Sequence, residues 1–183
     1  MRRKCKCRMQ NEECRIKEPA RAARPFLILR SAFIILHSLM SPSFSIRRRI
    51  QFSETDMAGI VHFSNFFRMM EEVEHAFFRS VGLSVSMQHD GMHVGWPRVS
   101  TSCDFFGPVK FEQEVELSLR VTRLGEKSFS YEVDFLLEGR RMALGKTTSV
   151  CCELRPDGSM KSIPIPDELR GKLSPPEPPT VQV

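Results

Sequence analysis

The sequence lacks an apolar run long enough to cross a membrane. A spanning helix needs about 20 predominantly apolar residues, whereas the segment PFLILRSAFIILHSLM (25–40) is shorter and carries Arg30 and His37. The basic stretch before it is too long for a secretory signal, and a clean small-residue cleavage site is missing. The pattern disfavours a transmembrane or secreted protein, and we expect a cytoplasmic location without membrane association.

The cysteine spacing of a disulfide framework or a zinc site is also missing. The pair Cys5 and Cys7 has no second C-x-x-C and no His pair to complete it. Cys103, Cys151 and Cys152 fall in segments with strand character. We therefore expect reduced thiols, and neither a metal nor any other cofactor.

Positive charge is scarce in the body of the chain, although the whole sequence has a net charge of +5 and a pI near 9.0. Residues 1–40 hold ten Lys or Arg and three Glu, a net charge of +7, so residues 41–183 carry −2. Nucleic-acid binding depends on basic groups on the folded surface. This distribution therefore argues against a nucleic-acid partner.

The chain divides into three parts. Residues 1–44 form a basic, partly apolar extension, interpreted either as disordered or as the result of a start codon placed too early, with Met40 as the true first residue. Residues 45–173 are long enough for a single domain with its own core. Residues 174–183, SPPEPPTVQV, are rich in proline, and we expect them to be disordered.

Several segments of the body alternate apolar and polar residues with the period of a strand. The segment EVELSLRVTRL places Val115, Leu117 and Leu119 on one side, with charged and hydroxyl side chains on the other. Glu138-Gly139-Arg140 marks a tight hairpin. Strands are predicted at residues 45–52, 97–106, 114–124, 127–137 and 141–154, and a polar loop at 84–96.

One long helix is predicted from His62 to about Val81. Its apolar residues recur every three or four positions, and Gly82 follows as a C-terminal cap. The predicted apolar stripe consists of Phe63, Phe66, Phe67, Met70, Val73, Phe77 and Val81. One strand, one long helix and then four strands predict an α+β fold, in which a curved antiparallel sheet wraps around one central helix.

Asp56 stands between the first strand and this helix, three residues before Gly59. The first N–H groups of a helix have no intrahelical partners and favour negative charge. A carboxylate beside them could attack a carbonyl or activate water, while an N–H near Phe63 stabilises the oxyanion. On these grounds alone, a turn-forming or capping aspartate is the simpler interpretation.

The segment RIQFSETDMAGIVHFSNFFRMMEE resembles the signature of the 4-hydroxybenzoyl-CoA thioesterase family of hotdog-fold proteins. In that family an R-I-x-F strand leads to an acidic turn ending in Asp, then to A-G-I-V and S-N-aromatic. The likeness continues through FFRSVGL (77–83), PRVSTSCDF (97–105) and EKSFSYEV (126–133), and spans about residues 45–165. It implies a hotdog thioesterase domain at 45–173.

The resemblance implies that Asp56 is the catalytic carboxylate, a nucleophile or general base that hydrolyses an acyl-CoA thioester to a free acid and CoA. It implies that the backbone N–H of Phe63 polarises the thioester carbonyl, in a substrate-binding turn with Gly59. Lys127 and Ser128 match a K-S pair placed near the CoA or the subunit interface. The family's edge-to-edge sheet pairing leads us to expect a homodimer or homotetramer.

The sequence departs from the family at two places. Met57 stands where the family has proline, so specificity for an aromatic acyl group does not follow from the resemblance. Related thioesterases of the Tol-Pal cluster carry a histidine at the position of Phe63, whereas here the histidine is one place earlier, at His62. His62 is interpreted either as a surface residue at the helix start or as a substrate-binding residue.

Other interpretations stay open. The chain is alternatively a non-catalytic hotdog acyl-CoA-binding or scaffold oligomer, or a protein anchored at a membrane surface by its leader. A hydratase of the same fold is disfavoured, because the expected His-bearing loop has no match. Trp96 lines an acyl pocket or caps a strand, and Phe66 and Phe67 are core residues that also reach the pocket wall. We expect His75 and Glu71 on the helix surface or at a subunit contact.

Overall fold

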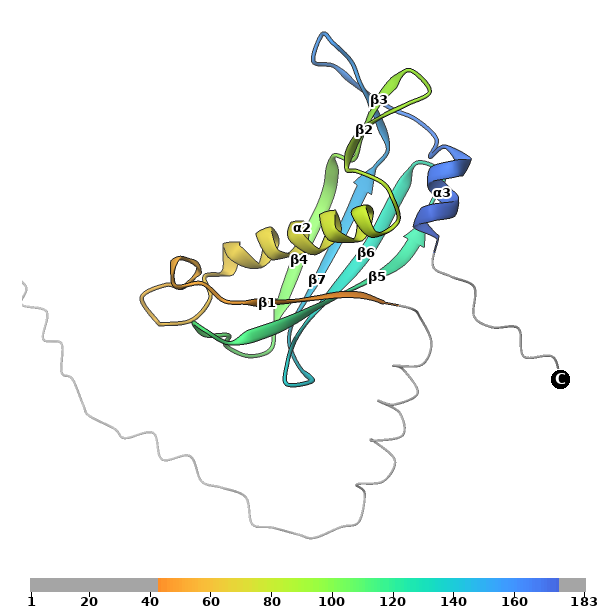
Figure 1. Cartoon of the computed structure of the whole chain (residues 1–183). Coiled ribbons are helices and arrows are strands. Elements are labelled where there is room, and N and C mark those ends of the chain that lie inside the picture. The colour runs from red at the N-terminus through yellow and green to blue at the C-terminus, as the bar shows by residue number, and fades with distance from the viewer. Residues whose placement is uncertain (1–42, 175–183) are drawn as a thin grey trace, which may run out of the picture. The chain divides into compact units, whose positions relative to one another are not determined.

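A computed structural model of the chain describes residues 43–174. Its main element is a five-stranded antiparallel sheet with the strand order β1-β5-β6-β7-β4, and one long helix, α2, lies across this sheet (Figure 1). The predicted arrangement is confirmed. The predictions for the leader and the tail fall on residues 1–42 and 175–183, outside the described residues. The sheet consists of β1 (Phe44–Arg49), β4 (Arg98–Phe105), β5 (Glu114–Leu124), β6 (Ser128–Leu137) and β7 (Arg140–Val150).

The core lies between α2 and the sheet, because alternation puts one apolar face of each central strand toward the helix. On β5 the buried residues are Val115, Leu117 and Leu119, as predicted. The facing residues of β6 are also buried, and each large apolar side chain removed from water contributes roughly 1.5–3 kcal/mol. These β6 residues are Phe129, Tyr131, Val133 and Phe135.

Helix α2 (Phe63–Ser80) buries a stripe that is shifted slightly from the predicted one. Phe63 is 60% exposed, although it was predicted to belong to the stripe. The helix lies close to β7 at Gly145, where a Cβ atom would be 2.5 Å from the sulfur of Met70. The buried residues of α2 are Phe66, Met69, Met70, Val73, Glu74 and Phe78.

The predicted cap at Gly82 is confirmed. Gly82 has a φ of +70°, and its N–H donates to the carbonyl of Arg79 (3.1 Å) while the N–H of Leu83 donates to Phe78 (2.8 Å). This pair of bonds is the Schellman arrangement, which satisfies the last carbonyls of a helix. In the hairpin between β6 and β7, Glu138 and Gly139 have φ angles of 51° and 77°. These positive angles are those of the two-residue turn that the sequence predicted there.

The prediction of a loop at 84–96 is wrong. This segment forms the hairpin β2 (Ser86–His89) and β3 (Met92–Gly95), which belongs to a second sheet of order β2-β3-β8-β9. The turn is Asp90-Gly91, with φ of 47° and 76°. Asp-Gly is a strong hairpin signal, but the strands are only four residues long and carry few apolar side chains.

The predicted strand 141–154 divides at Cys151. The N–H of Cys151 donates to the carbonyl of Lys127 (2.8 Å), and the carbonyl of Cys151 accepts from the N–H of Ile163 (2.9 Å). The chain leaves the main sheet there and continues as β8 (Cys152–Leu154), which pairs with β3 and β9 (Met160–Ser162). A short helix, α3 (Asp167–Leu173), follows and buries Leu169 and Leu173.

One charged side chain lies in the core. Glu74 of α2 is 1% exposed and forms a short ion pair with Arg98 at the start of β4. Burial raises the pKa of the Glu74 carboxyl, although the Arg98 guanidinium opposes this change. Arg98 also lies 3.3 Å from Glu71, so the middle of α2 is tied to the edge strand.

Candidate active site

The loop between β1 and α2 holds Asp56 in a tight turn. The N–H of Asp56 donates to the carbonyl of Ile60 (2.9 Å), and the N–H of Gly59 donates to the carbonyl of Asp56 (2.9 Å). Gly59 has a φ of +73°, a conformation that side-chain-bearing residues rarely adopt. No atom lies within 4 Å of a Cβ built at Gly59, so the backbone conformation, not space, calls for glycine.

The carboxylate of Asp56 is half-buried and anchored by one oxygen. Its Oδ1 accepts a hydrogen bond from the N–H of Ala58 (2.8 Å), which is the local bond of an Asx turn. Within residues 43–174, Oδ2 has no hydrogen-bond partner. The turn therefore orients the carboxylate and leaves one oxygen available for chemistry.

The start of α2 is fastened to the same loop. The carbonyl of Glu54 accepts two hydrogen bonds, from the N–H of His62 (2.9 Å) and from the side-chain amide of Asn65 (2.8 Å). Phe63 is the first helical residue, and within the described part of the chain its N–H has no acceptor. An open N–H at a helix N-terminus is a suitable donor to a developing oxyanion.

Asp56 and Phe63 line one pocket, with a volume of about 370 Å³. Phe66 and Phe105 form part of its wall, with ring centroids 4.9 Å apart in an edge-to-face arrangement. The prediction that Phe66 reaches the pocket is therefore confirmed, whereas Phe67 does not line it. The other lining residues are Ile60, Val61, Gly107, Pro108 and Val109.

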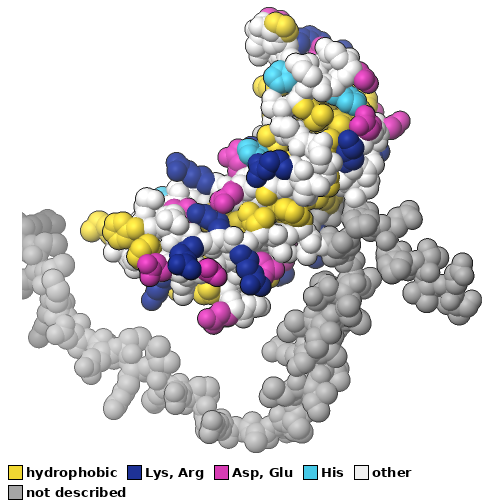
Figure 2. All heavy atoms as spheres, in the orientation of Figure 1, with side chains coloured by type: hydrophobic (Ala, Val, Ile, Leu, Met, Phe, Trp, Pro, Cys, Tyr) yellow, Lys and Arg dark blue, Asp and Glu magenta, His cyan; other side chains and the backbone are white. Residues whose placement is uncertain are grey.

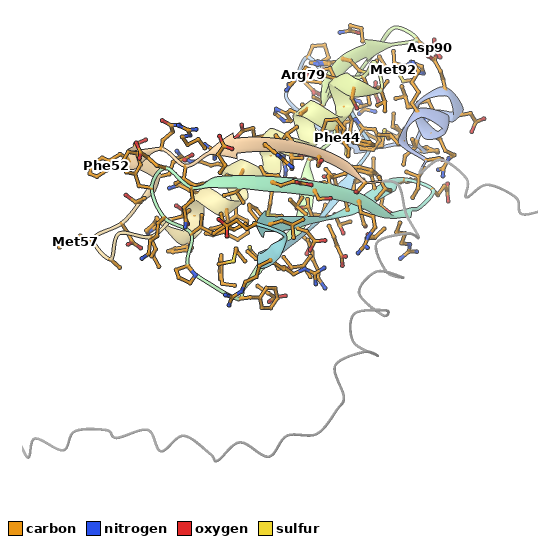
Figure 3. All side chains as sticks on the ribbon, turned by 60° about the horizontal axis from the view of Figure 1, so that its bottom comes forward. Phe44, Phe52, Met57, Arg79, Asp90 and Met92 are labelled. Carbon is orange, nitrogen blue, oxygen red and sulfur yellow. The ribbon has the colours of Figure 1, made fainter. Side chains whose placement is uncertain are left out.

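The surface near this loop is apolar. Figure 3 shows Phe52 and Met57 at the end of the molecule where the loop lies, and they are 75% and 106% exposed. Hydrophobic atoms gather at the same end in the space-filling view (Figure 2). Phe52 meets Phe111 edge to face, with ring centroids 5.7 Å apart.

Glu54 organises the loop and was not singled out from the sequence. Its carboxylate accepts from the side chain of Arg48 (2.6 Å) and from the N–H of Gln51 (2.8 Å). Arg48 lies 3.4 Å from Glu72 on α2 as well. The signal for Glu54 is the box that it forms with Gln51 three residues earlier, a recurrent pattern at the start of helical turns.

His62 is the N-cap of α2. Its Nδ1 lies 2.8 Å from the hydroxyl of Ser64 and 3.4 Å from the N–H of the same residue. The His62 ring does not line the pocket. The structure thus gives His62 a role at the helix start, beside the ring of Phe63 at a centroid distance of 4.4 Å.

Lys127 and Ser128 lie far from Asp56 in the same chain. The loop with Asp56 adjoins the beginning of β5, because the backbone N–H of Ile50 donates to the carbonyl of Gln113 (3.0 Å). Lys127 and Ser128 follow the other end of β5, whose 11 residues span on the order of 30 Å at about 3.3 Å per residue. One chain therefore does not bring the two groups together.

The remaining candidates lie outside the pocket. Trp96 is buried against Phe78, with ring centroids 5.7 Å apart, and so belongs to the core. His75 pairs with Glu71 at 3.7 Å on the helix surface. Burial, with Asp104 adding to it, raises the pKa of the Cys103 thiol to about 11, so this thiol is not an effective nucleophile at neutral pH.

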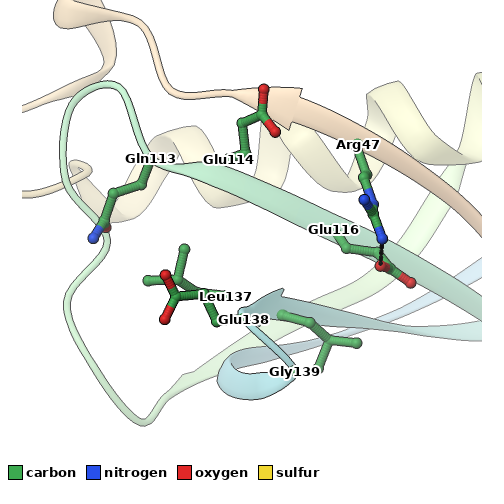
Figure 4. A pocket seen from close by; sticks show the side chains of 8 residues that line it. Arg47, Gln113, Glu114, Glu116, Leu137, Glu138 and Gly139 are labelled. Atoms are coloured by element: carbon green, nitrogen blue, oxygen red, sulfur yellow. Dashed lines mark hydrogen bonds and ion pairs between the residues drawn. The ribbon is translucent and has the colours of Figure 1, made fainter.

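A second hollow of about 370 Å³ lies on the other face of the sheet (Figure 4). Glu114 and Glu116 line it, and they alternate with buried residues of β5 that face α2. Arg47 lies 3.4 Å from Glu116, and Glu138 adds a third carboxylate. The hollow is acidic and has no helix N-terminus, so we place the candidate active site at Asp56.

Two further features concern the described residues only. Residues 43–174 contain no group of three or more His, Cys, Asp or Glu side chains placed to hold a metal ion. Over the same range, no helix combines the length and the apolar character needed to cross a bilayer.

A curved antiparallel sheet wrapped around one long helix is the hotdog fold, and a carboxylate in a pocket with an open helix N–H is suited to the hydrolysis of an acyl group. Residues 50–173 match the Thioesterase-like superfamily. The chain belongs to this superfamily, and it is a thioester hydrolase.

Individual relatives agree with this assignment. One from Aquifex aeolicus, which carries no more specific name than esterase, is 33% identical over 122 residues, covering 66% of this chain and 91% of the relative. A 1,4-dihydroxy-2-naphthoyl-CoA hydrolase from Synechocystis sp. is 27% identical over 126 residues, covering 68% and 91%. The solved structure of a gentisyl-coenzyme A thioesterase superposes with a TM-score of 0.61 at 27% identity, covering 72% of this chain and all of the other.

Proposed function

We propose that the protein hydrolyses acyl-CoA thioesters, with Asp56 as the catalytic carboxylate and the N–H of Phe63 as the oxyanion donor. The observation that carries the proposal is the shared pocket of Asp56 and Phe63. Relatives named as CoA hydrolases and CoA thioesterases support CoA as the thiol part of the substrate.

The chemistry follows from the two groups. The thioester carbonyl accepts a hydrogen bond from the Phe63 N–H, which makes its carbon more electrophilic and stabilises the oxyanion formed on attack. Asp56 either attacks this carbon, giving an anhydride that water then cleaves, or takes a proton from the water that attacks. In both routes the C–S bond breaks and CoA leaves as the thiol.

We propose that a second copy of the chain pairs with the edge strand β4. Within the described residues β4 has a strand neighbour on one side only, and Val99, Phe105 and Phe106 at this edge are 63%, 49% and 53% exposed. The opposite edge strand, β1, carries Arg47 and Arg49 in exposed ion pairs, the kind of charge that discourages strand pairing. An antiparallel pairing of two β4 strands gives a homodimer.

This pairing supports a role for Lys127 in binding CoA. Antiparallel strands place the pocket end of one sheet beside the far end of its partner, which is the end that carries Lys127 and Ser128. Lys127 is exposed there, and an ammonium group suits a phosphate of CoA. We expect Lys127→Met to raise KM for acyl-CoA and to leave kcat within about twofold.

The deciding experiment is CoA release from a panel of short, long and aromatic acyl-CoAs. We expect Asp56→Asn to lower kcat by at least about 10²-fold, the lower scale of general-base catalysis. Asp157→Asn is the matched control, because Asp157 holds the same kind of turn through the N–H of Ser159 (2.9 Å), outside the pocket.

Two outcomes overturn the proposal. Full activity of Asp56→Asn contradicts the role of Asp56, and failure of the wild type to cleave any thioester favours a non-catalytic acyl-CoA-binding module. A single turnover in H₂¹⁸O tests the nucleophilic route, since ¹⁸O in the Asp56 carboxylate requires an anhydride that water cleaves at the Asp56 carbonyl carbon.

A further inference from the structure

Arg48 on β1 connects three segments around the loop that carries Asp56. Its guanidinium donates to Oε1 of Glu54 at 2.6 Å and lies 3.4 Å from Oε2 of Glu72 on α2. The side chains of Arg48 and Glu54 are only 15% and 18% exposed, so water and salt screen this pair less than a surface pair. One guanidinium thus links the sheet, the loop and the helix.

The alternation of β1 puts Arg48 on the helix side of the sheet. Arg48 lies opposite Val115 of β5, which is buried toward α2, and residues opposite each other on paired strands share a face. The neighbouring Arg47 projects from the other face, where it pairs with Glu116 (3.4 Å). Because β1 and β4 are opposite edges of the sheet, a second copy paired with β4 lies on the far side from Arg48.

Glu54 links Arg48 to the two reacting groups. Glu54 stands two residues before Asp56, and its carbonyl accepts from the N–H of His62 (2.9 Å), the residue directly before Phe63. A shift of Glu54 therefore changes the position of the carboxylate relative to the open N–H at the helix start.

We propose that Arg48 is a positioning residue for hydrolysis and that it acts through Glu54. The proposal rests on the proposed function, since it takes Asp56 and the N–H of Phe63 as the reacting groups. Without Arg48, the carboxylate of Glu54 loses the one basic partner that it has among residues 43–174 and turns toward water. A misplacement of about 1 Å at a reacting group costs on the order of 10²-fold in rate, so a shift too small to unfold the protein slows the reaction.

Arg48→Met tests the proposal, with Arg47→Met as the matched control on the same strand. We expect Arg48→Met to lower kcat about tenfold and to leave KM within about twofold, because it displaces reacting groups and removes no contact with CoA. Arg47→Met removes an exposed pair and should leave both constants within about twofold.

Amide hydrogen exchange of residues 52–62 gives a reading that does not depend on activity. We expect exchange in this segment to be at least about fivefold faster in Arg48→Met than in the wild type, because the loop opens more often. Arg47→Met should exchange like the wild type.

A double-mutant cycle tests whether Arg48 acts through Glu54. Glu54→Gln keeps the size of the side chain and should lower kcat in the same way, so it carries the test if Arg48→Met does not fold. In the Glu54→Gln background, Arg48→Met should lower kcat by less than about twofold more. Glu72→Gln alone should change kcat by less than about twofold, because Glu72 is 48% exposed and lies farther from Arg48.

Three results overturn the inference: wild-type kcat or wild-type exchange in Arg48→Met, additive losses in the cycle, and a loss in Glu72→Gln as large as in Arg48→Met. If Arg48→Met does not fold, wild-type kcat in Glu54→Gln has the same meaning.

Failure of the proposed function is read separately. If Asp56→Asn hydrolyses acyl-CoA normally, the catalytic assignment fails. If Asp56→Asn is inactive while Arg48→Met keeps the wild-type kcat, only the role of Arg48 fails.

Discussion

The side-chain amide of Asn65 donates to the backbone carbonyl of Glu54 at 2.8 Å, across 11 residues of sequence. This bond joins the first turn of α2 to the loop that carries Asp56. The carbonyl of Glu54 also holds the N–H of His62. The shared acceptor thus ties the start of α2, with the open N–H of Phe63, to the loop that carries the Asp56 carboxylate.

Replacing Asn65 by alanine should reduce kcat more than it changes KM. The variant loses one hydrogen bond, worth roughly 1 kcal/mol of stability, and frees the helix start to shift relative to Asp56. We expect a decrease of about tenfold in kcat, measured with the best acyl-CoA of the panel. Ser80→Ala is the control, because Ser80 donates to a carbonyl at the other end of the same helix (2.7 Å). Equal kcat for the two variants would contradict this role of Asn65.

Gly59→Ala should cost stability through backbone conformation alone. A left-handed conformation costs a residue with Cβ roughly 1–2 kcal/mol, and the space around Gly59 is open. Gly158, with a φ of +81° and equally open space, provides the matched control. We expect similar losses in the free energy of unfolding for both alanine variants in urea titrations, but a loss of hydrolysis only at Gly59. Full activity of Gly59→Ala would show that the turn geometry is not required.

Arg98→Met should destabilise the protein more at pH 7 than at pH 5. Removing the guanidinium leaves Glu74 buried and unpaired, a change that costs about 3 kcal/mol at neutral pH. The pKa of Glu74 is already raised above its ordinary value of 4.5 and should rise further in the variant. A carboxyl with a raised folded-state pKa favours folding most below pH 4.5, and this contribution is lost as the pH rises through the folded pKa.

Urea unfolding of Arg98→Met at pH 5 and pH 7 gives this comparison directly. Arg49→Met removes an exposed pair with Glu114 (3.0 Å) and should cost at most about 1 kcal/mol at either pH. A loss that is independent of pH would mean that Glu74 does not take up a proton in the variant.

Stability should fall between about pH 9 and pH 11 in part because of Cys151. Burial, with Cys152 adding to it, raises the pKa of this thiol from 9.0 to about 11. The folded state keeps the proton while the unfolded chain releases it, so the contribution is complete below pH 9 and is lost as the pH rises through 11. The slope for one proton approaches about 1.4 kcal/mol per pH unit. Cys151→Ala should show a smaller slope in reversible unfolding over this range, and an unchanged slope would refute the assignment.

Much of the fold followed from local patterns. The alternation of β5 predicted its limits at residues 114 and 124 because one face of that strand meets the core and the other meets water. Gly82 and Gly139 marked a helix end and a hairpin because positive φ is accessible to glycine. The Asp90-Gly91 hairpin carried the same local signal, but its strands are too short for alternation to be recognised.

The sequence predicted that Asp56 lies just before the start of the helix, and the family resemblance implied its role. The tertiary structure decided which groups share its pocket. Phe105 and Val109 reach the pocket from segments more than 40 residues away. The local sequence around them shows that they are apolar but does not show which residues they contact. Glu74 and Arg98 are 24 residues apart, and only packing shows that one charge is buried against the other.

The sequence by itself determined the long helix, the strands of the main sheet and the fold class, and it marked Asp56 as the candidate acid, because hydrophobic periodicity, turn residues and the motif are properties of short segments. The tertiary structure decided that His62 caps the helix, that Phe63 turns outward to the pocket, and that Lys127 lies at the far end of the sheet. Each of these depends on how the helix is rotated and placed on the sheet. That placement is set by contacts between segments distant in the chain, which no local pattern encodes.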